Sequence, residues 1–472
     1  MNDIAINANW LAYIALLIWP AVALYLYSRL PVSKATLWTI LGGYLLLPVG
    51  LGIKFQIIPI FNKETIPNLA ALIGCALYAK RLPMFFRGFN LEVILIFSLL
   101  VGPFITSILN GDPISVGQTF VPGVGVYDAG STAFYEFIFI LPFFLGRQFL
   151  RSAEDNAEIL RVLAIAGLAF SLPILFELRM SPQLHYWIYG YYPASISEEM
   201  REGVFRPRVF FANGLLVAFF VMTTAVAAAA LWRTERRIGR VPPGGVTVYL
   251  SVILTLCRTL GAFVYGAVAV PLVRWMSPRM QLRVACILVT IALAYPMLRV
   301  ANLFPTDALL QAARVVSNDR AASMNTRFVN EDQLLEHALE RPWFGWGRYG
   351  RSRVYKGYLG SDISITDGYW IIILGQFGVF GFVGTFGLLA LAVFRAAMAL
   401  KFAPTMREAV LLSALAVIVA FNIVDMLPNA SMSPWTWLLV GALVGRAEAL
   451  REAGALRILG QNTRILIHHP TS

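Results

Sequence analysis

The chain has 472 residues, of which 58% are hydrophobic and 14% are charged, and its formal net charge is +12. Soluble domains carry roughly 25% charged residues, so this composition cannot cover a water-facing surface and excludes an ordinary soluble protein. The basic balance does not indicate a nucleic-acid partner, because cytoplasmic loops of membrane proteins collect Lys and Arg. The composition predicts an all-α polytopic membrane protein with about 12–14 transmembrane helices.

Apolar runs recur along the whole chain. A hydrocarbon core about 30 Å thick needs roughly 20 apolar residues per helix. We predict spans at 10–28, 36–53, 66–79, 91–109, 132–149, 158–176, 212–232, 246–257, 259–275, 284–302, 368–397, 408–426 and 433–446. The run 368–397 is too long for one upright helix, and a join at Gly378 and Gly381 would divide it into a short interfacial helix and a span. The first run follows no basic segment and has no small-residue cleavage site, so we expect it to remain as a span.

Charges in the short loops predict the orientation of these spans. Basic residues mark alternate loops as cytoplasmic. They are Arg29 and Lys34; Lys80, Arg81 and Arg87; Arg147 and Arg151; Arg233, Arg236, Arg237 and Arg240; Arg274, Arg279 and Arg283; Arg395, Lys401 and Arg407; and Arg446 and Arg451. The opposite loops include 110–131, which lacks Lys and Arg, and the long segments 177–211 and 299–367. The pattern predicts that the N-terminus and the long loops face outward.

The predicted spans and loops divide the chain into five parts. They are N-terminal helices (1–176), an outer loop (177–211), central helices (212–302), a large outward loop (303–367), and C-terminal helices with a cytoplasmic tail (368–472). We find no internal repeat, and the polar residues outside the spans are concentrated toward the C-terminal part of the chain. Inverted-repeat transporters show paired broken spans in matching halves. The asymmetry therefore favours an enzyme with an outward active site over a transporter.

No motif indicates a metal or an organic cofactor. Cys75, Cys257 and Cys286 all lie in apolar runs, and no Cys/His spacing suggests a disulfide or a metal site. The sequence lacks a Walker motif, a Rossmann glycine fingerprint, GxSxG and HExxH. We expect neither a metal nor a cofactor.

Arg206 and Arg208 stand just before the span 212–232, on the side where the positive-inside bias disfavours them. A guanidinium offers a planar fork of donors that matches phosphate oxygens. Binding of lipid headgroups is the alternative. Asn213, just inside the span, would cap the helix or hydrogen-bond a ligand.

Arg258 lies between the two short apolar runs 246–257 and 259–275. An arginine surrounded by apolar sequence is costly unless it faces a cavity or a partner, which makes it a functional hypothesis. The alternative is a tight outer turn from which the side chain extends to the interface.

The segment from Arg327 to Gly347 predicts an amphipathic helix that ends before Pro342, since the residue preceding proline disfavours the helical conformation. The aromatic and glycine residues after the proline suggest a turn at the membrane interface. His337 and Arg341 are candidate binding residues here, although a lone histidine is more often structural.

Asp367 opens the span 368–397. An acid at a helix start caps free N–H groups and gains from the helix dipole. The functional alternative is a carboxylate base beside a phosphate that the arginines hold. His185 begins an aromatic outer segment, 185–192, which would anchor at the interface or stack on sugar rings.

Over roughly residues 200–400 the chain resembles the O-antigen ligase and O-antigen polymerase superfamily. The resemblance lies in the segment Arg208–Asn213, in the lone Arg258 of a Ser-Arg-Gly-like turn, in 327–347, which is the most specific match, and in 367–381. Asp367 stands where the family has histidine. With a reference pKa near 4, aspartate is the weaker base unless it is desolvated. The difference points away from a lipid A-core ligase and toward an exopolysaccharide or capsule polymerase.

The resemblance implies a metal-independent inverting glycosyltransferase in the bacterial inner membrane, with its large loops in the periplasm. Its partners would be a glycan on undecaprenyl pyrophosphate, an acceptor glycan, membrane lipid and other polysaccharide assembly proteins. It implies catalytic roles for Asp367, Arg258 and Arg208, and substrate contacts for Arg206, Arg327, Asn213, His337 and Arg341. The alternatives are a non-enzymatic transporter or flippase of lipid-linked glycan, and an assembly protein without activity.

Overall fold

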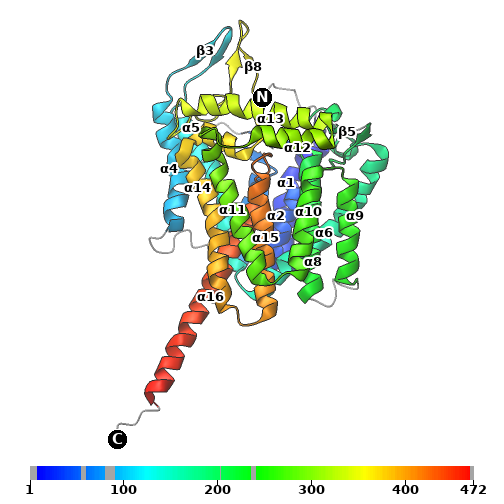
Figure 1. Cartoon of the computed structure of the whole chain (residues 1–472), viewed down its shortest axis with the longest axis vertical. Helices are drawn as coiled ribbons and strands as arrows, with labels where there is room; N and C mark the ends of the chain where they lie inside the picture. The colour runs from blue at the N-terminus through cyan, green and yellow to red at the C-terminus, as the bar shows by residue number, and fades with distance from the viewer. Residues whose placement is uncertain (1–7, 55–59, 80–90, 202, 235–240, 468–472) are drawn as a thin grey trace.

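The computed structural model describes residues 8–54, 60–79, 91–201, 203–234 and 241–467. Most of them form a bundle of helices (Figure 1). The bundle helices are α1 (Trp10–Arg29), α2 (Val32–Leu46), α3 (Thr65–Tyr78), α4 (Leu91–Leu109), α5 (Val126–Phe149), α6 (Ala153–Met180), α8 (Gly214–Thr234), α9 (Pro243–Leu256), α10 (Leu260–Trp275), α11 (Pro278–Val300), α14 (Tyr369–Ala399), α15 (Met406–Asp425) and α16 (Pro434–Ile467). A short 3-10 helix, η2 (Leu400–Phe402), follows α14.

Within the described residues, eight helices are long and apolar enough to cross a membrane. They are α1, α4, α5, α6, α8, α11, α14 with its extension to residue 402, and α15. Three shorter apolar helices, α3, α9 and α10, correspond to the predicted runs 66–79, 246–257 and 259–275. The predicted class, an all-α polytopic membrane protein, is confirmed.

One end of the bundle, which we call the loop end, carries the elements outside the spans. They are the short helices α7 (Leu184–Tyr189), η1 (Ile196–Glu199), α12 (Thr306–Val316) and α13 (Asn318–Leu339), and the antiparallel hairpins β1–β2 (Gly52–Ile53, Phe61–Asn62), β3–β4 (Ile114–Val116, Thr119–Val121), β5–β6 (Met200–Arg201, Val204–Phe205) and β7–β8 (Tyr355–Lys356, Ser361–Asp362). In Figure 1, α12 and α13 lie across this end. The segments 110–131, 177–211 and 299–367 therefore share one face, as the loop charges require, and the side of the membrane on which that face lies stays a prediction.

α14 is broken at Gly378, where φ is 65° and ψ is −162°. The break frees backbone groups that need partners. The turn at 342–347 supplies them: two of its N–H groups donate to the carbonyls of residues 375 and 376, and two of its carbonyls accept from the N–H groups of residues 379 and 380, over 2.7–3.1 Å. A Cβ at Gly378 would lie 2.4 Å from the carbonyl carbon of Trp343, so only glycine allows this approach. The expected join in the long run 368–397 is thus present.

The helix predicted before Pro342 is also present and is longer than its apolar positions indicated. α13 begins at Asn318 and ends at Leu339. Leu334, Leu335 and Ala338 are buried, whereas Leu339 is 44% exposed. All three cysteines are free. Parts of two basic loops predicted to be cytoplasmic, at 80–87 and 236–240, lie outside the described residues.

Candidate active site

Asp367 and Arg327 meet at the loop end. Asp367 lies just before α14, and Arg327 belongs to α13, which crosses this end of the bundle. Arg327 Nε is 3.4 Å from Asp367 Oδ2, and the two side chains are 32% and 42% exposed. An ion pair this open contributes little to stability. The contact therefore leaves a carboxylate and a cation side by side and accessible from water.

The cap of α14 does not use the Asp367 side chain. The N-cap residue is Gly368, and among the described residues no hydrogen bond joins the Asp367 carboxylate to the first turn. The Tyr369 N–H donates instead to the carbonyls of Met426 and Asn429, at 2.9 and 3.2 Å. The segment after α15 thus caps α14, which leaves the Asp367 carboxylate available for another role.

Asp425 is a second carboxylate near this site, and no sequence pattern indicated it. It ends α15 and is 4% exposed. Asn429 Nδ2 donates to its Oδ1 at 2.8 Å, while Oδ2 is buried without a hydrogen-bond partner in the described structure. The charge of Arg327 acts on Asp425 and on Tyr265 of α10. Arg327 thus pairs with the open carboxylate of Asp367, and its charge also acts on the buried carboxylate of Asp425.

Arg208 is buried, with 1% of its surface exposed. One terminal nitrogen donates to the carbonyl of Ala194 at 3.1 Å, whereas Nε and the other terminal nitrogen are buried without a hydrogen-bond partner among the described residues. Burial lowers the pKa of this guanidinium, and the nearby Glu199 and Glu177 oppose the shift. Buried donors without partners are rare, and they fit an anion that would accept from them.

Arg206 and Asn213, on either side of Arg208, contact groups of the protein itself. Arg206 lies 3.1 Å from Glu199 Oε2 and donates to the carbonyl of Glu198 at 3.1 Å. Asn213 Oδ1 accepts from the N–H of Leu216 at 3.1 Å, which is the capping alternative for this residue. Their substrate contacts stay a prediction, and these contacts favour structural roles.

Lys63 is a buried cation that the sequence analysis did not select. It precedes α3, its Nζ donates to the carbonyl of Phe210 at 2.6 Å, and it lies 5.5 Å from the ring centroid of Phe211. Burial lowers its pKa to about 7, although Glu64 opposes the shift. Because Phe210 follows Arg208 by only two residues, both cations border the same segment.

His185 lies beside this pair and is structural. Its Nδ1 contacts the carbonyl of Tyr191 at 2.9 Å, and its Nε2 accepts from the N–H of Val49 at 3.3 Å. Burial lowers its pKa to about 4, and the positive charges of Lys63 and Arg208 act in the same direction. The ring is therefore neutral at physiological pH and holds the outer loop to the end of α2.

Arg258 occupies the turn between α9 and α10 and is exposed. Its φ of 51° lies in the left-handed region, which is uncommon for a residue other than glycine. Its N–H donates to the carbonyl of Thr255 at 3.2 Å, and no side-chain partner is found within the described part of the chain. The turn thus leaves this guanidinium open to solvent.

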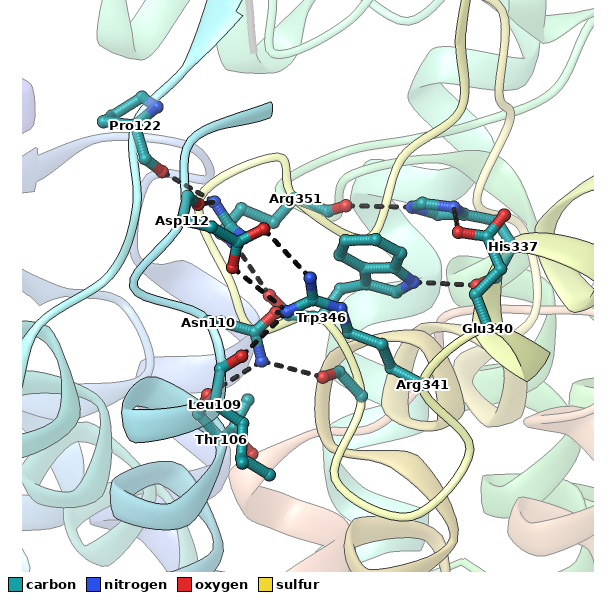
Figure 2. Close-up of polar contacts among 11 residues, drawn as sticks. Thr106, Leu109, Asn110, Asp112, Pro122, His337, Glu340, Arg341, Trp346 and Arg351 are labelled. Carbon is teal, nitrogen blue, oxygen red and sulfur yellow. Dashed lines mark hydrogen bonds and ion pairs between the residues drawn. The ribbon is translucent and has the colours of Figure 1, made fainter. Parts of the chain in front are cut away.

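His337 and Arg341 belong to a different, closed cluster (Figure 2). The His337 ring stacks on Trp346 with centroids 4.4 Å apart, and the Trp346 indole donates to the His337 carbonyl at 2.7 Å. Arg341 lies over the same indole at 4.0 Å and contacts Asp112 Oδ2 at 3.0 Å. These side chains hold one another, and their predicted substrate contacts remain untested.

Arg351 completes the closed cluster. Its side chain is 0% exposed, and it donates to the carbonyls of Asp112, Pro122 and Trp346 at 2.8, 2.9 and 3.1 Å (Figure 2). Hydrogen bonding from Arg341 lowers the pKa of Asp112, which keeps this carboxylate charged. The cluster fixes both ends of the β3–β4 hairpin to the turn that packs on α14.

Comparison with known protein families finds a match that covers part of the chain. Residues 244–386 match the family model described as O-antigen ligase. The chain carries an O-antigen ligase domain. The domain runs from α9 into α14 and contains Arg258, Arg327 and Asp367. A search of curated proteins finds no match.

The matched family model supports, in general, a function of the polysaccharide ligase or polymerase type. Together with the eight apolar helices, the family identifies it as a multi-pass membrane protein. Arg208 and Lys63 precede the matched domain and Asp425 follows it. The candidate site is therefore larger than the matched domain.

Proposed function

We propose that the protein is a metal-independent inverting glycosyltransferase, a polymerase or ligase that moves a glycan from undecaprenyl pyrophosphate to a sugar hydroxyl of an acceptor glycan. Such a reaction serves exopolysaccharide, capsule or O-antigen assembly. The observation that carries the proposal is the open contact between Asp367 and Arg327 inside the O-antigen ligase domain. It sets a carboxylate and a cation together at the end of the membrane helices, where a lipid-linked donor and a water-borne glycan can both arrive.

The reaction needs a base at the acceptor and positive charge at the leaving group. The acceptor oxygen bonds to the anomeric carbon of the donor while the bond from that carbon to the pyrophosphate oxygen breaks. The acceptor proton passes to Asp367, and undecaprenyl pyrophosphate leaves with the electron pair. Attack opposite the leaving group inverts the anomeric configuration. Holding the two substrates in line supplies much of the acceleration.

The cations of the loop end supply the positive charge in this proposal. Arg208 contributes two buried N–H groups without partners, and Arg258 contributes an exposed guanidinium. Lys63 adds a charge beside Arg208 when it is protonated. Donors fixed in a partly desolvated site stabilise developing charge without reorganising during the reaction. Arg327 orients Asp367.

The basic-loop alternation supports a site on the periplasmic side of the bacterial inner membrane. An impermeant maleimide tests this side in intact spheroplasts: a cysteine at position 318 should be labelled and one at position 238 should not. Labelling of 238 alone would reverse the orientation.

The activity is tested with purified protein in lipid nanodiscs. Lipid-linked repeat units and an acceptor glycan are supplied with and without EDTA, and the anomeric configuration of the product is determined by NMR. We expect inverted product in both conditions. Retained configuration, or loss of activity with EDTA, would contradict the mechanism. Donor binding without any product would favour the transporter or assembly alternative.

A further inference from the structure

Two hairpins of the loop end are joined at their turns into one body. The Gln118 N–H donates to the carbonyl of Tyr358 at 3.1 Å, and Thr119 Oγ1 donates to the carbonyl of Leu359 at 3.1 Å. Gly117 has φ +56°, and a Cβ there would lie 2.1 Å from the Tyr358 carbonyl oxygen. The glycine therefore permits this approach. We call residues 117–120 and 357–360 the hairpin tip.

The hairpin tip is anchored at its base as well. Arg351 donates to carbonyls at both ends of the β3–β4 hairpin, and the Ile363 N–H donates to the carbonyl of Val354 below the β7–β8 hairpin at 3.0 Å. Since the turn beside Arg351 packs on the break in α14, the tip is connected through hydrogen bonds to the helix that Asp367 opens.

Large apolar side chains stand exposed on this body. Phe120 is 65% exposed, Tyr358 is 81% exposed and Leu359 is 63% exposed. Below the tip, Arg353 contacts Asp362. Exposed apolar side chains grouped on one element mark an interaction site when they form a patch. The hydrogen bonds between the two hairpin turns keep these side chains exposed to solvent.

The position of the hairpin tip narrows the choice of ligand. In Figure 1, β3 and β8 project away from the bundle, beyond α13. The tip therefore points away from the bilayer that the spans occupy. A stable protein interface buries roughly 1,200–2,000 Å² in total, more than three side chains can offer. A chain of sugar rings fits better, because a pyranose has an apolar C–H face that covers an aromatic ring and polar edges that stay in water.

We propose that the hairpin tip binds the acceptor glycan several sugars away from its reacting hydroxyl, through stacking on Phe120 and Tyr358. The inference deepens the proposed function and rests on it. The fixed link from the tip to α14 would hold a long acceptor in a constant relation to Asp367. The tip is thus a determinant of acceptor length, and the transfer step itself does not use it.

Photo-crosslinking tests the contact directly. Benzoylphenylalanine replaces Tyr358 in the full-length protein, and in a control it replaces Leu303, which is 71% exposed at the same end of the bundle. After irradiation with a purified acceptor oligosaccharide in nanodiscs, we expect glycan on the protein labelled at 358 and little on the control. Equal glycan at both positions, or cross-links at 358 to lipid or protein alone, would overturn the proposal.

Kinetics test the consequence. The double substitution Phe120→Ser with Tyr358→Ser should raise KM for an acceptor of several repeat units about tenfold, equivalent to about 1.4 kcal/mol. Its kcat, its KM for a one-unit acceptor and its melting temperature should stay near wild type, and Tyr358→Phe should behave as wild type. Unchanged KM for the long acceptor would refute the tip as a glycan site. A wild-type protein that makes no product would refute the proposed function instead, and the cross-link would still report on the tip.

Discussion

The large loop of the O-antigen ligase domain holds two groups of arginines that look alike in the sequence and differ in the structure. Within the described residues, Arg327 forms an ion pair with Asp367, whose side chain is 42% exposed. Arg341 and Arg351 are surrounded by acceptors and lie against Trp346 and the β3–β4 hairpin. Both groups lie at the loop end, close to the same broken helix.

The difference lies in how many acceptors each guanidinium already has. A guanidinium has five N–H donors. Arg351 donates from Nε and one terminal nitrogen to three backbone carbonyls, and its other terminal nitrogen lies 3.6 Å from Asp112 Oδ1, so displacing it would leave those carbonyls without partners. Arg327 and Arg208 keep donors that a substrate could use. We therefore assign Arg341 and Arg351 to scaffolding and Arg327 and Arg208 to chemistry, and the following substitutions test that division.

Asp367→Asn has the largest expected effect. Removing a general base costs about 10²–10⁴-fold in rate, and the melting temperature should not change because backbone carbonyls cap α14. The measurement is kcat for glycan transfer, with the exposed Asp307→Asn as the control. Full activity of Asp367→Asn would remove the carboxylate from the mechanism.

Arg208→Lys should lower kcat/KM for the lipid-linked donor by about 10²–10³-fold, the usual cost of losing one donor to developing charge. Lysine keeps the charge but loses the planar fork. Arg206→Lys is the matched control, since lysine can still pair with Glu199. An equal loss of kcat/KM in the two variants would mean that the hydrogen-bond partners of these arginines within the protein do not predict their roles.

Arg351→Gln should act on stability instead. Loss of the charged donors to three carbonyls, one buried and two partly buried, should lower the free energy of unfolding by about 3 kcal/mol. The kcat of the folded fraction should remain near wild type. Arg353→Gln, which removes a partly exposed pair with Asp362, should cost less than about 1 kcal/mol. If Arg351→Gln is as stable as wild type and inactive, the closed cluster belongs to the chemistry.

Lys63 should give donor affinity a pH dependence. Its folded pKa is about 7 against an ordinary 10.5, so it is charged below pH 7 and loses its charge as pH rises through 7. KM for the donor should therefore rise between pH 6 and pH 8, by up to about tenfold if one phosphate contact is lost. Between pH 7 and 10.5 the unfolded chain binds this proton and the folded chain does not, so stability should increase with pH over that window.

Lys63→Met should remove both pH dependences, whereas Lys401→Met, at the opposite end of the bundle, should preserve them. A donor KM that is flat from pH 6 to 8 in wild type would exclude Lys63 from the anion site.

The smallest effect is expected at Asn213. Asn213→Ala should lower the free energy of unfolding by about 1 kcal/mol through loss of the α8 cap, and Asn213→Ser should restore it. Both variants should transfer glycan at the wild-type rate. Loss of activity in Asn213→Ser at normal stability would instead show a contact with substrate.

Much of the candidate site could be predicted from the sequence. Arg258 and Asp367 stand out because a charge beside an apolar run is costly unless it reaches water or a partner. Lys63 and Asp425 did not stand out, although each ends or begins an apolar helix, because single charges at span ends are common. Their importance depends on burial and on neighbours such as Phe210 and Asn429, which lie elsewhere in the chain or beyond the helix end.

The sequence by itself determined the membrane class, the approximate positions of most of the apolar helices, the gathering of the long loops at one end and the join in the run 368–397, whereas the run 36–53 was too long, because α2 ends at Leu46. These depend on bilayer thickness, loop charge and the local demands of glycine and proline, all of which act over short stretches. Only the tertiary structure decided which arginine side chains already donate hydrogen bonds to acceptors within the protein. Arg351 and Pro122 are far apart in the sequence, as are Lys63 and Phe210, and no local pattern records such contacts. The chemistry of each cation depends on those contacts, because a donor that is already paired inside the protein cannot also bind a substrate.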